Sequence, residues 1–262
     1  MKFVVTIIFF FITTSSYAVT FNGKFIQGSF ILGKTEPGSI VFIDKRKVKI
    51  TSKGLFVFGL GRDRKNDIVI KINGKKIIKK VLKREYKIQK IDGLEKTKVT
   101  PPEEVYERIK KENKLIGNAR AINSDLDFFK EKFIIPVENA IITGVYGSQR
   151  ILNGIPKWPH YGLDFAAAKG TEIRAMLDGV VTLANADLFY TGGTLVFDHG
   201  HGISTLYMHM EKLLVKEGQK VKQGDIIGTV GATGRATGAH LDVRLNWFQI
   251  RLDPATVLKL SN

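Results

Sequence analysis

The sequence predicts a mainly β protein in which a small antiparallel β domain, a helical connector and a second β-rich domain follow one another. Three observations support this fold class. Residues 19–92 contain many short alternating or β-branched runs, residues 102–122 carry apolar side chains at helical spacing, and residues 134–262 return to glycine-rich β runs. The 262 residues, 44% of them hydrophobic, suffice for one or two globular domains.

The chain opens with MKFVVTIIFFFITTSSYAVT, a stretch typical of a secretory signal peptide at residues 1–18. Lys2 precedes a short apolar run, and Ser16 and Ala18 are the small residues expected before a cleavage point. We expect cleavage after Ala18, because the apolar run is shorter than the roughly 20 residues that a membrane span needs. A retained N-terminal anchor is the alternative. The absence of cysteine excludes disulfides and thiolate metal sites.

The predicted N-terminal β domain, residues 19–92, lies in the most basic part of the chain. Residues 19–100 hold 21 Lys/Arg and 7 Asp/Glu, whereas positive and negative residues nearly balance elsewhere in a chain of net charge +16. Turn sequences such as PGS, SKG and NGK separate its β runs. An excess of positive charge favours binding to an anionic envelope polymer or a membrane surface. Two alternatives are a solvated basic surface without a partner and a segment that folds over the groove of the functional site. Export argues against nucleic acid.

Residues 93–133 are predicted to be a linker and helical connector. The breaker Pro101-Pro102 precedes EEVYERIKKENKLIGNARAI, in which acidic residues come early. Apolar residues then recur at helical spacing, at Val105, Ile109, Leu115 and Ala119. We expect a helix over roughly 102–122 and a second turn around 126–133.

All five histidines lie in the third segment, residues 134–262, where chemistry is therefore expected. His160 and Asp164, four residues apart in HYGLD, are able to reach one metal ion through nitrogen and oxygen, although such a pair alone is most often accidental. We interpret His199 and His201 in DHGHG as turn residues between two strands, with His201 the one that could also line a cleft.

Two further patterns read as strands. In GISTLYMHM, alternation predicts that Tyr207 and His209 share a face, and a half-buried strand histidine is the plain alternative to a functional one. In GAHLDVRLNW, the same alternation puts His240, Asp242 and Arg244 on one face, so that His240 and Asp242 could share a metal or Asp242 could pair with Arg244. The glycine-rich GATGRATGA before it lacks the Walker spacing, and its glycines suit tight turns beside a cleft.

Together these segments resemble the lysostaphin/LytM-type zinc metallopeptidases, which cut peptide bonds in peptidoglycan, over most of residues 134–255. The resemblance rests on GSQRILNGIPKWPHYGLDFAAAKGTEIRA, LVFDHGHGISTLYMHM, VKEGQKVKQGDIIGTVGATGRATGAHL and a closing RLDP. The N-terminal segment and connector also look like those of exported Gram-negative members. The resemblance implies a LytM-type peptidase domain at 134–262 with a groove over an antiparallel sheet, and a periplasmic protein that binds peptidoglycan.

The resemblance also assigns roles to residues. His160 and Asp164 match the first two zinc ligands of the family, and His209 and His240 match its catalytic histidines. The third ligand of the family is the second histidine of an HxH motif, and here it is Asp242. The implied cofactor is one Zn²⁺ per chain held by His160, Asp164 and Asp242, with another divalent ion as the alternative.

Asp242 leaves two interpretations open. Either it ligates the metal with Arg244 as a hydrogen-bonding partner, or it pairs with Arg244 and the metal is lost. In the second case the chain is a catalytically degenerate LytM-type regulator that activates another cell-wall hydrolase. Retention of the other four site residues favours the endopeptidase, because a site without function is expected to lose several of its residues.

Overall fold

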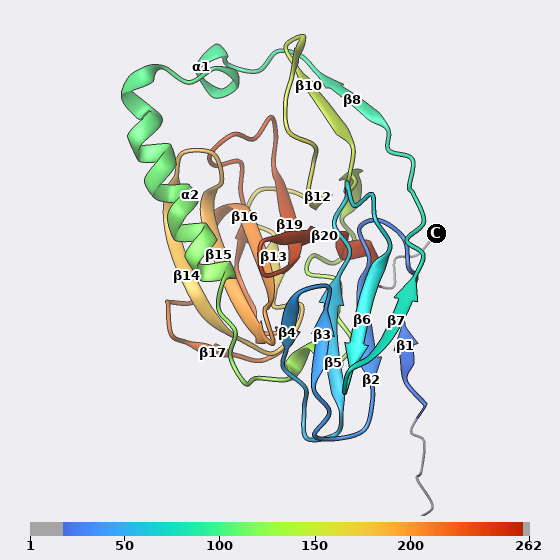
Figure 1. Ribbon diagram of the computed structural model, residues 1–262. Helices are drawn as coiled ribbons and strands as arrows, with labels where there is room; N and C mark the ends of the chain where they lie inside the picture. The colour runs from blue at the N-terminus through green and yellow to red at the C-terminus, as the bar shows by residue number, and fades with distance from the viewer. Residues whose placement is uncertain (1–17, 259–262) are drawn as a thin grey trace, which may run out of the picture.

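The computed structural model describes residues 18–258, which form several sheets and one long helix (Figure 1). The predicted mainly β fold with a helical connector is confirmed. The signal peptide predicted at residues 1–18 lies, apart from Ala18, outside the described residues. None of the helices formed by the described residues has the length and apolar character needed to cross a membrane.

The N-terminal residues form two small antiparallel sheets, as their alternating pattern predicts. The first sheet has the strand order β1 (Thr20–Asn22), β2 (Phe30–Lys34), β5 (Leu55–Gly59). The second has the order β4 (Arg46–Val48), β3 (Val41–Ile43), β6 (Ile68–Ile72), β7 (Lys75–Lys79). In β6 the isoleucines Ile68, Ile70 and Ile72 are buried while Lys71 is exposed, so that one face of this sheet packs on the core.

The last strand of the N-terminal segment pairs with the C-terminal half. β8 (Ile88–Ile91) runs parallel to β10 (Gln149–Leu152), which also pairs with β11 (Ile155–Pro156). Between β8 and β10 the chain forms a short helix that the sequence did not predict, and then the predicted connector helix. These elements are α1 (Lys96–Val99), η1 (Glu103–Val105), α2 (Tyr106–Arg120) and η2 (Phe128–Lys130).

A ten-stranded sheet dominates the C-terminal half. Its main path runs β17 (Lys220–Val221), β14 (Gly179–Leu188), β15 (Gly192–Gly200), β16 (Ile203–Leu213), β19 (His240–Trp247), β12 (Leu163–Ala166), β9 (Ile141–Gly144). Off this path lie β13 (Glu172–Arg174), β18 (Ile226–Val230) and β20 (Ile250–Leu252), and a 3-10 turn η3 (Pro254–Thr256) follows. The central strands β16 and β19 are therefore neighbours of β12, which carries Asp164.

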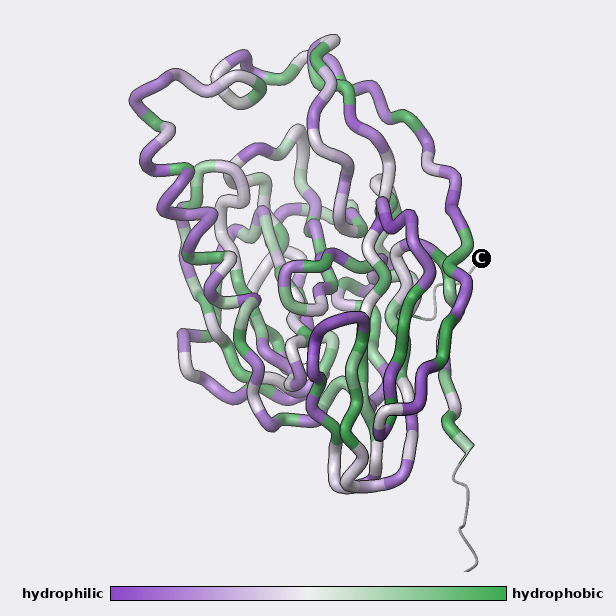
Figure 2. The backbone as a smooth tube through the Cα atoms, in the orientation of Figure 1, coloured by the Kyte–Doolittle hydropathy of each residue, from purple (hydrophilic) through white to green (hydrophobic). Residues whose placement is uncertain are grey.

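The two halves share one hydrophobic core. Buried residues from both halves, such as Phe58 of β5 and Leu252 of β20, belong to the same cluster. A Cβ added at Gly59 would lie 2.4 Å from Leu252 Cδ2, so the two strands touch at this glycine. Figure 2 shows the hydrophobic colours following the strands, whereas α2 is mainly hydrophilic. Ala119 of α2 packs on the opposite face of the large sheet, in a second cluster with Leu206.

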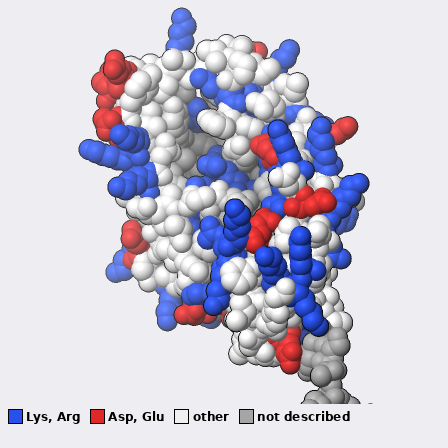
Figure 3. All heavy atoms as spheres, viewed as in Figure 1, with Lys and Arg blue, Asp and Glu red and all other residues white. Residues whose placement is uncertain are grey.

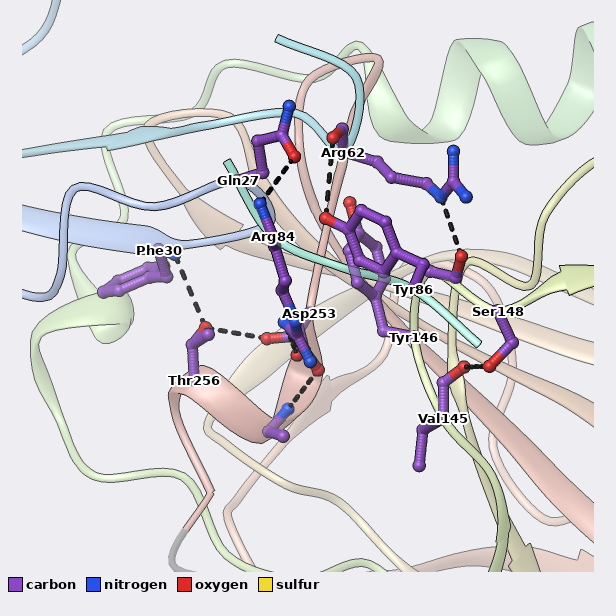
Figure 4. Close-up of polar contacts among 12 residues, drawn as sticks. Gln27, Phe30, Arg62, Arg84, Tyr86, Val145, Tyr146, Ser148, Asp253 and Thr256 are labelled. Atoms are coloured by element: carbon purple, nitrogen blue, oxygen red, sulfur yellow. Dashed lines mark hydrogen bonds and ion pairs between the residues drawn. The ribbon is translucent and has the colours of Figure 1, made fainter. Parts of the chain in front are cut away.

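Polar contacts also fix the N-terminal segment against the end of the C-terminal half (Figure 4). Arg84 forms an ion pair of 2.5 Å with the buried carboxylate of Asp253. Arg62 Nε donates to the carbonyl of Gly147 at 2.8 Å, and its guanidinium lies 4.4 Å from the centroid of the Tyr86 ring. The basic segment is thus held in place beside the large sheet, which sets the position of β8 next to the functional site.

Candidate metal centre

Three predicted ligand residues converge on one point at the centre of the large sheet. His160 precedes β12, Asp164 lies in β12, and Asp242 lies in β19. Asp164 and Asp242 are direct partners in the antiparallel register of these strands, which brings their Cβ atoms to about 5 Å. One ligand atom of each of the three residues lies within 4.8 Å of the others, and all three residues are buried.

Two facing atoms of this cluster lack hydrogen-bond partners. His160 Nε2 lies 3.0 Å from Asp164 Oδ1 and 3.4 Å from Asp242 Oδ2. Among the residues that the structure describes, neither His160 Nε2 nor Asp164 Oδ1 has a partner in hydrogen-bonding geometry. Buried polar atoms are nearly always satisfied, so this group of acceptors fits a bound cation. One histidine nitrogen and two carboxylate oxygens are donors that zinc accepts, and three protein ligands are the number found in catalytic zinc sites.

Two glycines make room for the carboxylates. A Cβ at Gly144 of β9 would lie 2.0 Å from Asp164 Oδ2, and a Cβ at Gly162 would lie 2.0 Å from Asp242 Oδ1. Any larger residue at either position would displace a carboxylate. Gly162 stands inside the HYGLD motif, so the same short stretch supplies two ligands and the space for the third.

An arginine faces each carboxylate. Arg150 Nη2 lies 3.2 Å from Asp164 Oδ2, and Arg244 contacts both oxygens of Asp242, at 3.0 Å from Oδ2 and 3.4 Å from Oδ1. Burial alone would raise the pKa of Asp242, but the positive charges of Arg244 and His160 hold it well below its usual range. Asp242 is therefore anionic, and its Oδ2 faces both Arg244 and His160. Arg150 was not predicted as a site residue, because no recognisable spacing in the sequence connects it to Asp164.

The two predicted catalytic histidines stand together beside this centre. The ring centroids of His209 and His240 are 4.8 Å apart. His209 Nδ1 lies 2.8 Å from the carbonyl of Thr233, and His240 Nδ1 lies 2.8 Å from the carbonyl of Gly238. A carbonyl only accepts hydrogen bonds, so the Nδ1 atom of each ring carries a proton and faces away from the cleft, and in a neutral ring Nε2 is the acceptor. Burial lowers the pKa of His209 to about 4, which makes it neutral at pH 7.

Both accepting carbonyls come from the glycine-rich stretch before β19. The sequence predicted only that this stretch would allow tight turns beside a cleft. In the structure it also fixes the tautomers and ring orientations of both histidines, through backbone atoms that no side-chain motif reveals.

The side chain of His209 faces the cleft, where regular strand alternation with Tyr207 would not place it. Tyr207 is part of the core, where its hydroxyl accepts from the Met176 N–H at 2.9 Å, whereas His209 lines the cleft together with Met208. The prediction that Tyr207 and His209 share a face was therefore wrong. His209 has a φ of +64°, at the point where β16 leaves β19 after Met208 and pairs with β18 from Met210.

The other strand prediction is confirmed. His240, Asp242 and Arg244 line the cleft, while the intervening Leu241 and Val243 belong to the core. Alternation holds here because β19 keeps regular antiparallel pairing with both β12 and β16.

The two remaining histidines have structural contacts. His199 lies within β15 and is fully buried, with Nδ1 2.7 Å from the carbonyl of Asp178 and Nε2 2.8 Å from Thr205 Oγ1. The prediction that it is a turn residue was wrong. His201 does lie in the turn that follows β15, where its ring packs 4.8 Å from that of Phe129.

The site opens into two adjoining cavities. The smaller, about 340 Å³, is lined by Asp164, His209 and His240 and by Gln89 and Ile91 of β8, so the end of the N-terminal segment forms one of its walls. The larger, about 700 Å³, extends past Asp242 to α2. Figure 3 shows a hollow on this face with Lys and Arg atoms in and around it.

Comparison with known proteins places this site in context. Residues 158–254, which include all five predicted site residues, match the model of Peptidase family M23. Peptidoglycan DD-endopeptidase ShyA of Vibrio cholerae is 46% identical over 87 residues, 33% of this chain and 20% of that protein. DD-carboxypeptidase/endopeptidase Mpg of Neisseria meningitidis is 43% identical over 89 residues, again 33% and 20%. The matched stretch thus spans about a fifth of each curated relative.

One solved structure is similar over nearly the whole chain. The crystal structure of a candidate peptidase M23 from Pseudomonas aeruginosa has a TM-score of 0.70 and 26% identity, and the match covers 89% of this chain and 95% of that one. The family resemblance drawn from the sequence motifs is confirmed by these matches, and the structural one extends beyond the C-terminal segment to the N-terminal strands and the connector.

Proposed function

We propose that this chain, whose residues 158–254 form a domain of peptidase family M23, is a zinc-dependent endopeptidase that hydrolyses peptide cross-links of peptidoglycan. One observation carries the proposal. His160, Asp164 and Asp242 bring three ligand atoms within 4.8 Å of one another, in a cleft that His209 and His240 also line. The names of the two relatives, a peptidoglycan DD-endopeptidase and a DD-carboxypeptidase/endopeptidase, support the substrate class.

The protein residues divide the work around the metal. His160, Asp164 and Asp242 would hold the ion, which when bound polarises a carbonyl group and makes water more nucleophilic. Arg150 and Arg244 orient the two carboxylates, and the charge of Arg244 keeps Asp242 ionised.

The two histidines supply proton transfer. Nδ1 of His209 carries the proton and burial keeps the ring neutral at pH 7, so its Nε2 is able to accept a proton from the attacking water. The Nε2 atom of His240 stands beside it as the second group for proton transfer. Once protonated, the same Nε2–H donates to the developing oxyanion or to the leaving amine. The backbone carbonyls of Thr233 and Gly238 hold both rings in the orientation that this exchange requires.

We further propose that the protein is exported to the periplasm of a Gram-negative bacterium, with its signal peptide removed after Ala18. The apolar N-terminal run and the cell-wall relatives support this location. The basic N-terminal segment would hold the enzyme on anionic envelope polymers. Mass spectrometry of the mature protein should give Val19 as its first residue, and an intact Met1 in the envelope fraction would instead indicate a retained anchor.

A second function is favoured by a specific contact. Arg244 engages both oxygens of Asp242, which is the arrangement expected if the arginine has replaced the metal as the partner of this carboxylate. The chain would then be a regulator that activates another cell-wall hydrolase. Four other site residues in place around the cleft support the enzyme over the regulator.

Metal analysis separates the two functions. Protein purified without chelator is expected to contain about one zinc per chain, and a His160→Ala control should lose it. With purified peptidoglycan, the wild type should convert dimeric muropeptides to monomers, and the control should not. Absence of metal together with absence of hydrolysis after addition of Zn²⁺ or Mn²⁺ would support the regulator. Persistent dimers with free glycan strands would indicate a hydrolase of another kind.

A further inference from the structure

The larger cavity has an excess of positive charge that the metal centre does not use. One acidic side chain, Asp242, lines it. Six basic side chains line it as well: Arg120, Arg150, Lys157, Arg235, Arg244 and Arg251. They come from elements far apart in the sequence, with Arg120 at the end of α2, Arg244 in β19 and Arg251 in β20. The fold brings these basic side chains to one cavity, so the electrostatic potential there is strongly positive.

Two of these arginines have no acidic partner. Within residues 18–258, no carboxylate lies within 4.0 Å of the guanidinium of Arg120 or Arg251, in contrast to Arg150 and Arg244. Arg120 is only 8% exposed, donates to Gln249 Oε1 at 2.5 Å, and leaves its buried Nε without a partner. The buried Nε of Arg251 also lacks a partner.

Neighbouring positive charges act on both guanidiniums, and Arg251 also lies over the ring of Tyr161, 4.7 Å from its centroid. Burial, followed by the positive charges of Arg251 and Arg244, lowers the pKa of Arg120 to about 10. Burial and the charge of Arg244 also lower the pKa of Arg251. Both groups remain cationic at neutral pH. Burying unpaired like charges destabilises a folded protein, so a ligand of opposite charge would relieve both the desolvation and the repulsion.

We propose that Arg120 and Arg251 bind a free carboxylate of the peptide substrate in the cavity that extends from Asp242 to α2. This inference rests on the proposed function, since it names the charge of the substrate for the same cleft. The planar fork of a guanidinium matches a carboxylate in two parallel hydrogen bonds. Any peptide with a free C-terminus carries such a carboxylate. Arg244 contacts Asp242 and interacts electrostatically with both arginines, so the anion site begins directly beside the metal centre.

The test measures binding and does not depend on hydrolysis. The probes are purified muropeptide dimers with free carboxylates and the same dimers after chemical amidation, titrated calorimetrically into full-length protein freed of metal by chelation. We expect amidation to weaken binding at least about tenfold, and Arg120→Gln and Arg251→Gln each to weaken binding of the carboxylate form about tenfold. Neither variant should change binding of the amidated dimers.

Matched variants exclude trivial causes. Lys114→Gln removes one charge from the exposed side of α2 and should leave both affinities unchanged. Arg120→Lys and Arg251→Lys keep the charge but lose the fork, so they should bind the carboxylate form better than the Gln variants and worse than the wild type. Thermal melting of each variant checks that it is folded, and if a Gln variant is unfolded the Lys variant carries the comparison.

Several outcomes would overturn the proposal. Equal affinity for free and amidated dimers would do so, as would equal loss of both in the Gln variants. Competition by inorganic phosphate without any effect of amidation would indicate a phosphate site in place of a carboxylate site. A preference for free carboxylates in metal-free protein, together with no hydrolysis of either dimer after Zn²⁺ is restored, would refute the proposed enzyme while leaving the anion site intact.

Discussion

The metal centre and the arginine-lined cavity lie side by side and share Asp242, but they differ in whether their charged side chains have partners of opposite charge. In the metal centre, each of two buried carboxylates faces one arginine, and the described residues offer no hydrogen-bond partner to His160 Nε2 or Asp164 Oδ1. In the cavity, no carboxylate of residues 18–258 lies within ion-pair distance of Arg120 or Arg251. The first arrangement suits a cation, and the second suits an anion. The proposed function requires both arrangements in one cleft, one for a metal and one for a charged peptide beside it.

The largest effect is expected from removing one charge at the metal centre. Asp164→Asn keeps the shape of the side chain but lowers the affinity of a ligand atom for a divalent ion, and it leaves Arg150 without its partner. We expect metal content to fall close to zero and hydrolysis of muropeptide dimers to fall by more than about 100-fold.

The matched control makes the same chemical change elsewhere in the domain. Asp178→Asn removes a carboxylate that pairs with Lys222 far from the cleft, and it should leave metal content and hydrolysis unchanged. If Asp164→Asn retained one metal per chain, the assignment of Asp164 as a ligand would be wrong.

The next effect separates the two interpretations of Asp242. If Arg244 orients a ligating Asp242, then Arg244→Gln should weaken metal binding roughly 10- to 100-fold, as loss of an outer hydrogen-bonding partner usually does. If Arg244 instead competes with the metal for Asp242, the same variant should bind metal more tightly than the wild type. Zinc titration against a competing chelator gives the sign directly, and Arg150→Gln provides the same comparison for Asp164.

Stability should change in opposite directions on the two sides of the cleft. Arg150→Met would leave the buried Asp164 with His160 as its remaining partner beside Asp242, so the free energy of unfolding of metal-free protein should fall by about 2 kcal/mol. Arg120→Met would remove an unpaired buried charge and should raise it by about 1 kcal/mol, at the expense of substrate binding. Urea denaturation measures both. A destabilised Arg120→Met protein would contradict the contrast between the two regions.

The two halves of the candidate metal centre could each be recognised from sequence because their information is local, whereas the family resemblance joined them into one ligand set. His160 and Asp164 lie in one five-residue motif, and His240 and Asp242 lie two apart on a regular strand, so short-range geometry fixes their relation. The connector helix was predictable for the same reason, since Pro101-Pro102 and the apolar spacing after it are local signals.

The parts that sequence could not reveal depend on distant contacts. The parallel pairing of β8 with β10 joins residues about 60 positions apart, and no turn signal links them. His209 departs from alternation because β16 changes partners at that residue, which depends on the positions of β18 and β19. The meeting of Arg120, Arg244 and Arg251 similarly requires α2 to pack beside the sheet.

His199, which is buried away from the cleft, shows how a buried ionisable group with neutral hydrogen-bond partners affects the pH dependence of stability. Burial lowers the pKa of His199 to about 4, below the value of about 6.5 for an unfolded chain. The unfolded state therefore binds the proton first as pH falls, and stability is lost between about pH 6.5 and 4. Between pH 7.5 and 5 the loss should be about 2 kcal/mol, and His199→Gln should remove this part of the pH dependence. An unchanged slope in the variant would show that other groups control acid unfolding.

The smallest expected effect concerns the basic surface outside the cleft. Lys75, Lys76 and Lys80 are exposed in and beside β7. They would attract an anionic polymer through salt-screened electrostatics and not through hydrogen bonds of fixed geometry. Changing the three to glutamine should reduce retention on isolated sacculi about threefold at 0.1 M salt and leave no difference at 1 M, because the Debye length falls from about 10 Å to about 3 Å. The matched control changes Lys110, Lys111 and Lys114 of α2, which removes the same charge from the connector. If both triple variants lost retention equally, net charge alone would account for binding, and the N-terminal segment would have no distinct role. If only the β7 variant lost retention, the N-terminal segment would bind the polymer through long-range, salt-screened attraction. Such binding would contrast with the directed hydrogen bonds by which Arg120 and Arg251 are proposed to bind one peptide carboxylate.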